Sequence, residues 1–191
     1  METETSWHYD VGFYHKLTSN TDTRLSVYYI DITDYEVVDS AGLYYSSNYA
    51  YNLDSMKFYG VEWEFNTALF DKLNLFGNYS FREMDRDKTD LPVVFWLNLP
   101  PKHKANLSLR YTLFKDTLLT SDFRYVGRRE SEGGYTMDEY FVTDVGIEHT
   151  FLDNIKVLFY ANNILGENYK ELYGYPMPDQ VLGVQVKMSF F

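Results

Sequence analysis

Hydrophobic and polar residues alternate along the last part of the chain. In residues 155–162 every second position is apolar, and in residues 182–190 the same pattern continues over a longer run. An alternation with a period of two residues predicts β-strands whose successive side chains point to opposite faces of a sheet. Strands in soluble domains usually have about five or six residues, whereas a tilted strand that crosses a bilayer needs roughly nine to eleven. The second run therefore favours a membrane-spanning strand.

The same alternation recurs along most of the chain and predicts nine strands in total. The expected strands cover residues 6–17, 24–35, 58–69, 74–82, 104–111, 119–128, 141–151, 155–162 and 182–190. The phase of the pattern becomes unclear at Tyr29 and Ile30, where we expect a β-bulge. The chain therefore reads as an all-β protein with long strands.

Connections between these strands alternate between short and long. The short links cover residues 18–22, 70–72, 115–116 and 153–154, and the long ones cover residues 36–53, 83–103, 129–139 and 163–181. This order is typical of outer-membrane barrels, in which short periplasmic turns oppose long extracellular loops. The alternative, a soluble β-sandwich, would bury its apolar face against a second sheet and would not need such long strands. The pattern predicts an antiparallel transmembrane β-barrel, with residues 1–191 in one domain.

Charged residues keep to one phase of the alternation. A lysine or arginine on the lipid face costs about 2–4 kcal/mol at the middle of a bilayer, so we expect the charged phase to face the lumen. The exceptions are few and lie near strand ends, chiefly His15, Asp31 and His149. The residues expected to face the lumen include Glu62, Glu64, Arg82, Arg110, Arg124 and Asp144.

Composition supports this interpretation and excludes other classes. Aromatic residues make up 19% of the 191 residues while the mean hydropathy is only −0.38, which suits a polar lumen and aromatic girdles. No apolar run approaches the length of a transmembrane helix. The net charge of −11 argues against a basic patch that binds nucleic acid. No cysteine is present, so disulfides and thiolate metal sites are excluded.

The sequence contains no catalytic constellation, so we expect no enzyme activity. Glu62 and Glu64 are two residues apart on one strand face, about 7 Å from each other, but a lumen-facing pair bonded to neighbouring cations explains them better than acid–base catalysis. The histidines lie on different strands without the spacing of metal ligands. Acidic clusters in the loops, such as Asp138 and Glu139, could hold Ca²⁺ between loops, although solvated loops explain them as well. We expect no resident metal or cofactor.

The long loops carry the candidate ligand-binding residues. Their aromatic residues are Tyr44, Tyr45, Tyr49, Tyr51, Phe95, Trp96, Tyr135, Tyr173 and Tyr175. Arg128 and Arg129 add positive charge at the same rim. Aromatic rings with a few cations suit the capture of a flat, anionic or metal-chelate ligand by stacking and charge. The alternative is that many of these tyrosines belong to the outer interfacial girdle.

Five motifs in this order resemble the C-terminal barrel of TonB-dependent outer-membrane receptors. They are the FYGVEWE of residues 58–64, the LPPKHKAN of 99–106, the RYVG of 124–127, the ANNILGENY of 161–169 and the YGYPMP of 173–178. Asp179 and Gln180 depart from the usual Gly-Arg, and Phe191 lies one residue beyond the in-phase Phe190. No stretch resembles the plug domain or the energy-coupling box of this family.

The resemblance implies a function and a location. Such receptors lie in the bacterial outer membrane, bind a scarce nutrient such as a ferric siderophore or cobalamin in their outer loops, and pass it through the lumen when a plug is pulled. This chain would supply barrel wall and extracellular loops. Its expected partners are outer-membrane lipid, the N-terminal plug and remaining strands of the same receptor, and a small-molecule metal chelate or vitamin. Which nutrient it takes does not follow from the residues.

The odd number of strands leaves two architectures open. A closed barrel normally has an even number of strands, and the family has about 22. Either the nine strands are part of a larger wall, or a tenth strand comes from residues 43–51 or 91–99. The second case would give a small self-contained barrel that acts as an anchor, adhesin or passive pore. The start of the chain lacks the features of a signal peptide, so we expect either an artificial start at Met1 or a longer precursor.

Overall fold

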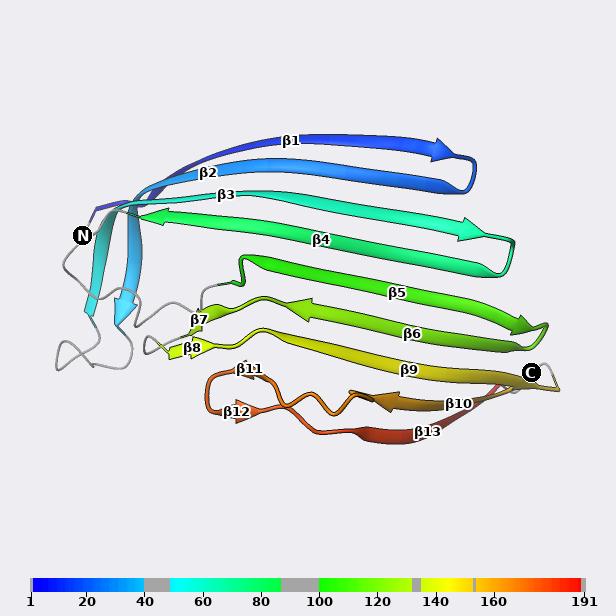
Figure 1. Cartoon of the computed structure of the whole chain (residues 1–191). Helices are drawn as coiled ribbons and strands as arrows, with labels where there is room; N and C mark the ends of the chain where they lie inside the picture. The colour runs from blue at the N-terminus through cyan, green and yellow to red at the C-terminus, as the bar shows by residue number, and fades with distance from the viewer. Residues whose placement is uncertain (1, 40–48, 87–99, 132–134, 153, 190–191) are drawn as a thin grey trace.

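The computed structural model describes residues 2–39, 49–86, 100–131, 135–152 and 154–189. Nine strands of this part form one antiparallel sheet in chain order (Figure 1). They are β1 (Thr5–Thr18), β2 (Thr21–Asp39), β3 (Tyr49–Leu69), β4 (Leu73–Arg86), β5 (His103–Phe114), β6 (Thr117–Val126), β9 (Tyr140–Phe151), β10 (Ile155–Asn162) and β13 (Val181–Met188). Two short hairpins pair β7 (Arg129–Ser131) with β8 (Tyr135–Met137) and β11 (Lys170–Leu172) with β12 (Tyr175–Pro176). The described residues contain no helix that is long and apolar enough to span a bilayer.

The nine predicted strands and their antiparallel order are confirmed, but several strands extend beyond the predicted bounds, most of all β2 and β3. β2 continues to Asp39, and β3 already begins at Tyr49. Much of the expected loop at residues 36–53 is therefore strand. The outer ends of β2 and β3 turn away from the direction of the rest of the sheet (Figure 1).

The predicted bulge at Tyr29 and Ile30 is wrong. Both residues pair without a break, with β1 on one side and β3 on the other. The hydrophobic pattern blurs there for another reason, because Tyr28, Ile32 and Met56 on the polar face are buried near the outer end of the sheet. Apolar residues therefore occupy both faces at that level. The pairing of β2 with β3 is interrupted only further on, at Asp34, which has a positive φ of 57°.

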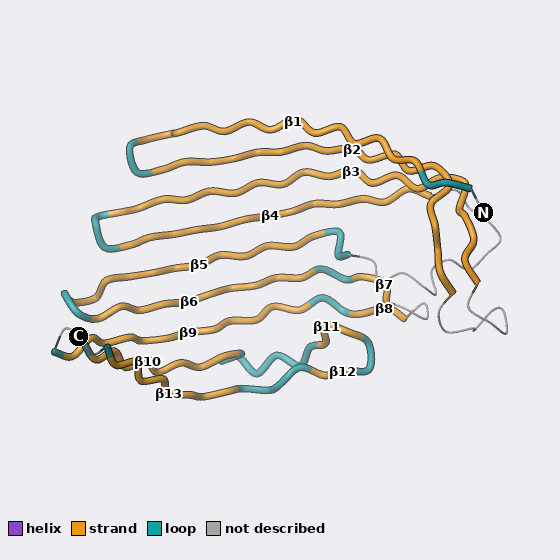
Figure 2. The backbone as a smooth tube through the Cα atoms, turned by 180° about the vertical axis from the view of Figure 1, so that it is seen from behind, coloured by secondary structure: helices purple, strands orange, loops and turns teal. Residues whose placement is uncertain are grey.

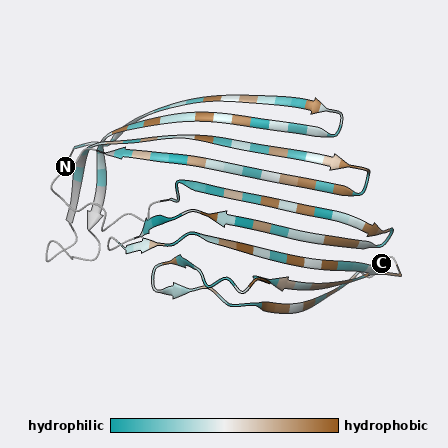
Figure 3. Cartoon of the chain, viewed as in Figure 1, coloured by the Kyte–Doolittle hydropathy of each residue, from teal (hydrophilic) through white to brown (hydrophobic). Residues whose placement is uncertain are grey.

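The pairing register keeps the two faces distinct across the sheet. One row on the apolar face consists of Val11, Val27, Val61 and Phe81. The neighbouring row on the opposite face consists of Gly12, Ser26, Glu62, Ser80 and Lys104. Figure 3 shows the alternation of hydrophobic and hydrophilic residues along the strands. Large apolar side chains remain exposed on the first face, as Val11 (75%) and Leu182 (80%) do. A sheet of this kind needs an apolar surrounding on one side and a polar one on the other.

Aromatic rings cover glycines on the adjacent strand at three places. Phe65 lies across Gly77, Tyr160 lies across Gly183, and Tyr28 lies across Gly60. A Cβ atom at any of these glycines would overlap the ring that covers it. In each pair the ring packs over the glycine, which has no side chain of its own, and so covers the backbone there. The space at the glycine also determines the direction in which the ring lies.

The sheet has two free edges in the described part of the chain, at β1 and β13. Figure 2 shows the strands from behind, with the short turns gathered at one end of the sheet and the longer connections at the other. β1 and β13 both run toward the short turns, since each ends beside them. The two edge strands are therefore parallel to each other in direction.

Candidate functional site

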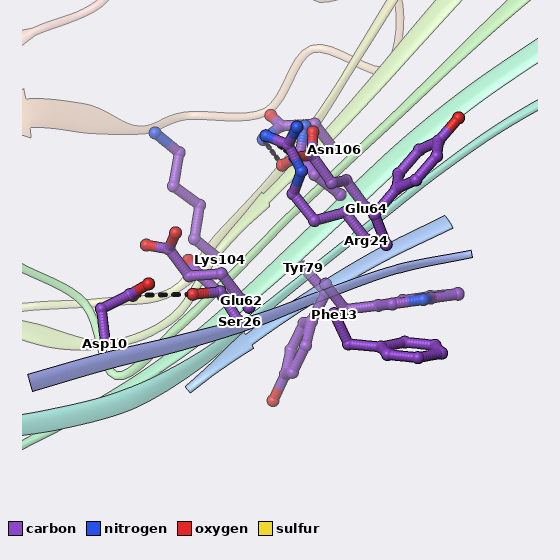
Figure 4. A pocket seen from close by; sticks show the side chains of 14 residues that line it. Asp10, Phe13, Arg24, Ser26, Glu62, Glu64, Tyr79, Lys104 and Asn106 are labelled. Carbon is purple, nitrogen blue, oxygen red and sulfur yellow. Dashed lines mark hydrogen bonds and ion pairs between the residues drawn. The ribbon is translucent and has the colours of Figure 1, made fainter. Parts of the chain in front are cut away.

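The polar face of β1 to β5 forms an open recess of about 670 Å³. Figure 4 shows Asp10, Glu62 and Lys104 on this face, while Phe13 points to the opposite side of the strands. Ser26 Oγ donates a hydrogen bond of 2.8 Å to Asp10, and an ion pair of 3.4 Å joins Arg24 to Glu64. The structure thus places Glu62 and Glu64 together with two cations on the charged face. Glu62 and Glu64 therefore lie beside cationic side chains on this face.

Further ion pairs cross the strands on the same face. Arg110 Nη2 donates to both carboxylate oxygens of Asp122, each at 3.1 Å. Lys156 contacts Glu148 at 3.2 Å. The first pair is bifurcated, because one nitrogen reaches both oxygens, and both side chains are partly exposed, so its contribution to stability is small.

A small apolar core lies at the loop end of the sheet, where β6 and β9 meet the segment after β10. It contains Val126, Tyr140, Val142 and Tyr169, and Met177 packs against it. Arg124 lies beside this core, with its Cζ atom 5.8 Å from the ring centre of Tyr140 and 5.6 Å from that of Tyr169. Cation–π contacts of this kind stabilise an arginine that has lost part of its hydration. The core holds the segment between β10 and β13 against the wall.

Arg124 and Arg129 attach the β11–β12 hairpin to this core. Arg124 forms an ion pair of 3.0 Å with Glu171 and donates a hydrogen bond of 3.1 Å to the Tyr169 hydroxyl. Arg129 Nη2 donates to the carbonyl oxygens of Lys170 and Glu171, both at 3.1 Å. One arginine from strand β6 of the wall and one from the β7–β8 hairpin therefore hold the side chain of Glu171 and the backbone of the β11–β12 hairpin.

Asn163 organises the chain directly after β10. Its side chain is buried, its amide nitrogen donates to the Glu167 carbonyl at 2.8 Å, and its amide oxygen accepts from the Glu167 backbone at 2.8 Å. Its own backbone N–H donates to Asp144 Oδ1 at 2.7 Å. Its φ of 51° is a conformation that asparagine tolerates better than most residues. Asp144, expected to face the lumen, thus supports the loop.

Two of the predicted ligand-binding tyrosines are in contact with each other. The rings of Tyr135 and Tyr173 stack with centroids 3.8 Å apart and planes 5° apart. Lys170 Nζ lies 5.8 Å from the centre of the Tyr173 ring. This stack joins the β7–β8 hairpin to the β11–β12 hairpin. Tyr175 is exposed at the end of the second hairpin and can contact a ligand or a lipid headgroup.

A second recess of about 470 Å³ lies at the outer ends of β4 and β5, next to the β7–β8 hairpin. Arg82, Lys102, Arg128 and Arg129 line it together with Glu83 and Glu130. Phe58 and Met84 add an apolar part and pair with each other across the strands. Since Phe58, Met84 and Arg82 belong to the polar phase of their strands, the recess opens on the polar face of the sheet. Its positive charge contrasts with the net charge of −11 for the whole chain.

Several predicted residues lie outside this description. Tyr44, Tyr45, Phe95 and Trp96 fall outside the described residues, as does the whole segment 91–99. Tyr49 and Tyr51 belong to β3, but their side chains are not described. Residues 49–51 therefore extend a predicted strand, and the rest of the segment 43–51 lies outside the described part. Among the described residues, no cluster of three or more histidines or carboxylates is arranged to hold a metal ion.

The loop end of the sheet, with its two short hairpins, is called the mouth. Sequence reasoning missed several residues that surround the predicted ligand-binding residues there. Tyr28, Lys102 and Tyr140 had no signal that set them apart from other strand residues. Asn163 and Tyr169 lay inside the motif of residues 161–169, which was a signal for family but not for their contacts. Their neighbours depend on strand register, and alternation alone does not fix register.

The comparison with protein families is decisive. The family model described as TonB dependent receptor-like, beta-barrel, matches residues 1–164. The chain belongs to this family. No curated protein sequence matches the chain.

The sheet of this TonB-dependent receptor barrel is similar to parts of several solved structures. The copper transporter OprC matches with a TM-score of 0.77 and 17% identity, over 98% of this chain and 31% of its own. The pyoverdine receptor FpvA from Pseudomonas aeruginosa gives 0.76 and 15%, over 98% and 30%. The ferric yersiniabactin uptake receptor FyuA from Yersinia pestis gives 0.74 and 15%, over 98% and 30%. The chain thus spans about a third of the length of these proteins, and the likeness shows a shared fold.

Three of the family motifs meet at the mouth of the sheet. Arg124 from the RYVG motif contacts Tyr169 from the ANNILGENY motif, and Met177 from the YGYPMP motif packs against the same core. Gln180, which stands where the family usually has arginine, donates from Nε2 to the Ile164 carbonyl at 2.6 Å. Residues of these motifs therefore hold the loop after β10 in place, and Gln180 stabilises the same loop through its hydrogen bond to Ile164.

Proposed function

We propose that the chain forms part of the wall and the outer loops of a receptor in the bacterial outer membrane, which takes up a metal chelate with energy supplied through TonB. The family match over residues 1–164 carries this proposal. The sheet supports it, because one face is apolar and exposed while the other is charged. These are the surfaces that a barrel wall presents to lipid and to its lumen.

The proposed substrate class is a metal chelate such as a ferric siderophore. Three of the similar structures are a copper transporter, a receptor bound to pyoverdine and a ferric yersiniabactin uptake receptor. The mouth of this chain combines the stacked rings of Tyr135 and Tyr173 with a cationic recess. Rings and cations together suit a compact chelate with delocalised electrons. Cobalamin, the other nutrient implied by the resemblance, is a separate arm of the test.

The direction of the edge strands supports further strands in the complete wall. β1 and β13 run the same way, so direct closure of one on the other would create a parallel pair in an otherwise antiparallel sheet. An odd number of additional strands between them restores the alternation. Open edges cannot face lipid. We propose that the remaining strands of the receptor supply this part and that its plug covers the charged face.

An uptake experiment tests the proposed function. Cells that carry the full-length receptor are grown with a ferric siderophore as the sole iron source, and a matched culture depends on cobalamin. We expect growth on at least one siderophore, and loss of that growth when either the receptor or TonB is deleted. Growth on every siderophore without the receptor, or growth that persists without TonB, contradicts the proposal.

The smaller alternative makes a different prediction. Residues 1–191 expressed alone would fold in detergent into a compact, heat-modifiable monomer if they formed a self-contained anchor, adhesin or pore. We expect no such species, because the nine described strands leave two open edges. Electrophoresis with and without heating, followed by mass spectrometry, distinguishes the two architectures.

A further inference from the structure

Arg82 has no carboxylate partner among the residues whose side chains are described, unlike Arg24, Arg110 and Arg124. In the described part of the chain, the paired arginines of the charged face are joined in the ion pairs Arg24–Glu64, Arg110–Asp122 and Arg124–Glu171. Arg82 is half-buried and forms no ion pair with any described residue. A guanidinium that loses hydration without a counter-charge is unfavourable. Among the described residues, no carboxylate therefore balances the charge of Arg82.

Neighbouring residues hold Arg82 in a fixed orientation. Arg82 Nε donates a hydrogen bond of 2.9 Å to the Tyr28 hydroxyl, and its Cζ atom lies 5.9 Å from the centre of the Tyr28 ring. Tyr28 can lie in this place because residue 60 is glycine, where a Cβ atom would stand 2.6 Å from the hydroxyl oxygen. The hydrogen bond uses Nε, so both terminal nitrogens of Arg82 remain to bind another group. The fork is oriented before any ligand arrives.

Arg129 contributes a second guanidinium without a counter-charge to the same recess. Its Nη2 is bonded to two backbone carbonyls, and its Cζ atom lies 5.7 Å from the ring centre of Tyr140. Its Nη1 is shielded from solvent and has no acceptor in the described part of the chain. Buried donors without an acceptor are rare in native proteins and call for an explanation such as a bound water or ion. Arg129 Nη1 therefore lacks an acceptor in the described part of the chain, although Glu83 and Glu130 also line the recess.

No described carboxylate in or beside the recess forms an ion pair with Arg82 or Arg129, and Glu130, which also lines the recess, is exposed. Glu83 contacts Lys102 at 2.7 Å, and Asp138 contacts Arg128 only at 3.7 Å, with both of the latter side chains exposed. An exposed pair at that distance is weak, so Arg128 can turn toward a ligand. The recess of about 470 Å³ thus has an excess of positive charge, because Arg82, Lys102, Arg128 and Arg129 line it with only Glu83 and Glu130.

We propose that this recess binds an oxyanion, a carboxylate or phosphate-type group, through Arg82 and Arg129 with Arg128 at its exposed side. Arginine forks match such groups in geometry and charge. The inference rests on the proposed function and deepens it, because the oxyanion would be the anionic arm of the chelate. The recess opens on the polar face, so a soluble ligand reaches it and a lipid headgroup outside the wall does not. Tyr28 and Gly60 act as positioning residues for Arg82.

Binding of inorganic pyrophosphate to the full-length receptor in detergent tests this site. Isothermal titration calorimetry at fixed ionic strength should show that Arg82→Gln and Arg129→Gln each weaken binding roughly tenfold or more, since each removes a charge-assisted interaction. Arg82→Lys, which keeps the charge but loses the fork, should fall between. Lys115→Gln, the same loss of charge in an exposed turn, should stay within about twofold.

A positioning variant separates this site from a general effect of charge. Tyr28→Phe keeps the ring and every charge but removes the acceptor of Arg82 Nε, so pyrophosphate affinity should fall several-fold with unchanged heat-modifiability. Equal affinity in wild type, Arg82→Gln and Arg129→Gln overturns the inference, as does a wild-type receptor that does not bind pyrophosphate. Siderophore-dependent growth that survives such a result leaves the proposed function intact, whereas loss of TonB-dependent growth in wild-type cells refutes the function itself.

Discussion

At the scale of single residues, glycines and aromatic rings act as matched pairs in this sheet. The ring of Tyr160 occupies the space above Gly183, its partner on β13, and Phe65 does the same above Gly77. By contrast, no atom lies within 4 Å of the position that a Cβ of Gly12 would take. Glycines of equal appearance in the sequence therefore have different roles.

We predict that Gly183→Ala destabilises the folded receptor by about 1–3 kcal/mol, because the new methyl group overlaps the Tyr160 ring. Tyr160→Ala removes that ring, so the double variant should cost less than the sum of the single variants. Gly12→Ala is the matched control and should be close to neutral. Urea unfolding in lipid vesicles measures the free energy of unfolding of the wild type and the four variants. Equal losses of stability for Gly12→Ala and Gly183→Ala would contradict the pairing.

Asn163 forms hydrogen bonds to Glu167 and to Asp144 through its side chain and its backbone. We predict that Asn163→Ala destabilises the loop after β10 by about 1–3 kcal/mol, since part-buried backbone groups of Glu167 lose their partners. Asn162→Ala, an exposed substitution at the next position, serves as the control. Hydrogen exchange of residues 163–169 is the measurement, and unchanged protection in Asn163→Ala would show that the loop is held by other contacts.

At the scale of elements, two loop hairpins are attached to the wall and to each other. Arg124 and Arg129 hold β11–β12 from the side of the sheet, and the stack of Tyr135 on Tyr173 joins it to β7–β8. Preorganised loops lose less conformational entropy when a ligand binds. The two hairpins are therefore preorganised at the loop end of the sheet.

We predict that Arg124→Met frees the β11–β12 hairpin without unfolding the sheet. The substitution keeps an apolar stem over the tyrosines but removes the ion pair with Glu171 and the hydrogen bond to Tyr169. Hydrogen exchange should accelerate at Lys170–Leu172 while β6 and β9 stay protected. Arg128→Met, at an exposed arginine with one long ion pair, is the control. Equal exchange in both variants would mean that Arg124 does not hold the hairpin.

The elements also show how far the sequence alone could lead. Alternation located all nine long strands because each has one face against an apolar surrounding. It failed at Tyr28, Ile32 and Met56, where the charged face itself becomes buried and the period of two is lost. The strands of β7, β8, β11 and β12 have two or three residues, which is too short for any periodicity.

The recess shows the same limit for the site. The alternation predicted the face on which Arg82 lies, and the loop positions drew attention to Arg128 and Arg129. The contacts of Arg82 with Tyr28 and the space at Gly60 follow from the register of β2, β3 and β4. Register is set by pairing across strands, and one sequence without partners does not specify it. The hydrogen bonds of Arg129 to Lys170 and Glu171 likewise could not be predicted from the sequence.

At the scale of the whole molecule, the sheet has one apolar face and one charged face. Leu107 and Asn106 are neighbours on β5, and they pair with Phe123 and Arg124 on opposite faces. We predict that Leu107→Arg destabilises the receptor by about 2–4 kcal/mol, the cost of a cation on the lipid face near the midplane. Asn106→Arg should cost much less. Similar losses at both positions, measured by urea unfolding in vesicles, would argue against a lipid-facing surface at Leu107.

The most direct measurement is a cysteine scan of β5, since residues 1–191 contain no cysteine of their own. Any cysteine elsewhere in the full-length receptor is first replaced by serine. Single cysteines are introduced in turn at residues 105–109 of β5, spin-labelled in the full-length receptor in lipid vesicles, and examined by electron paramagnetic resonance. We predict that collisions with dissolved oxygen, which concentrates in lipid, are frequent at 105, 107 and 109 and rare at 106 and 108. Oxygen accessibility without this period of two, or highest at 106 and 108, would contradict a transmembrane wall with its charged face inward.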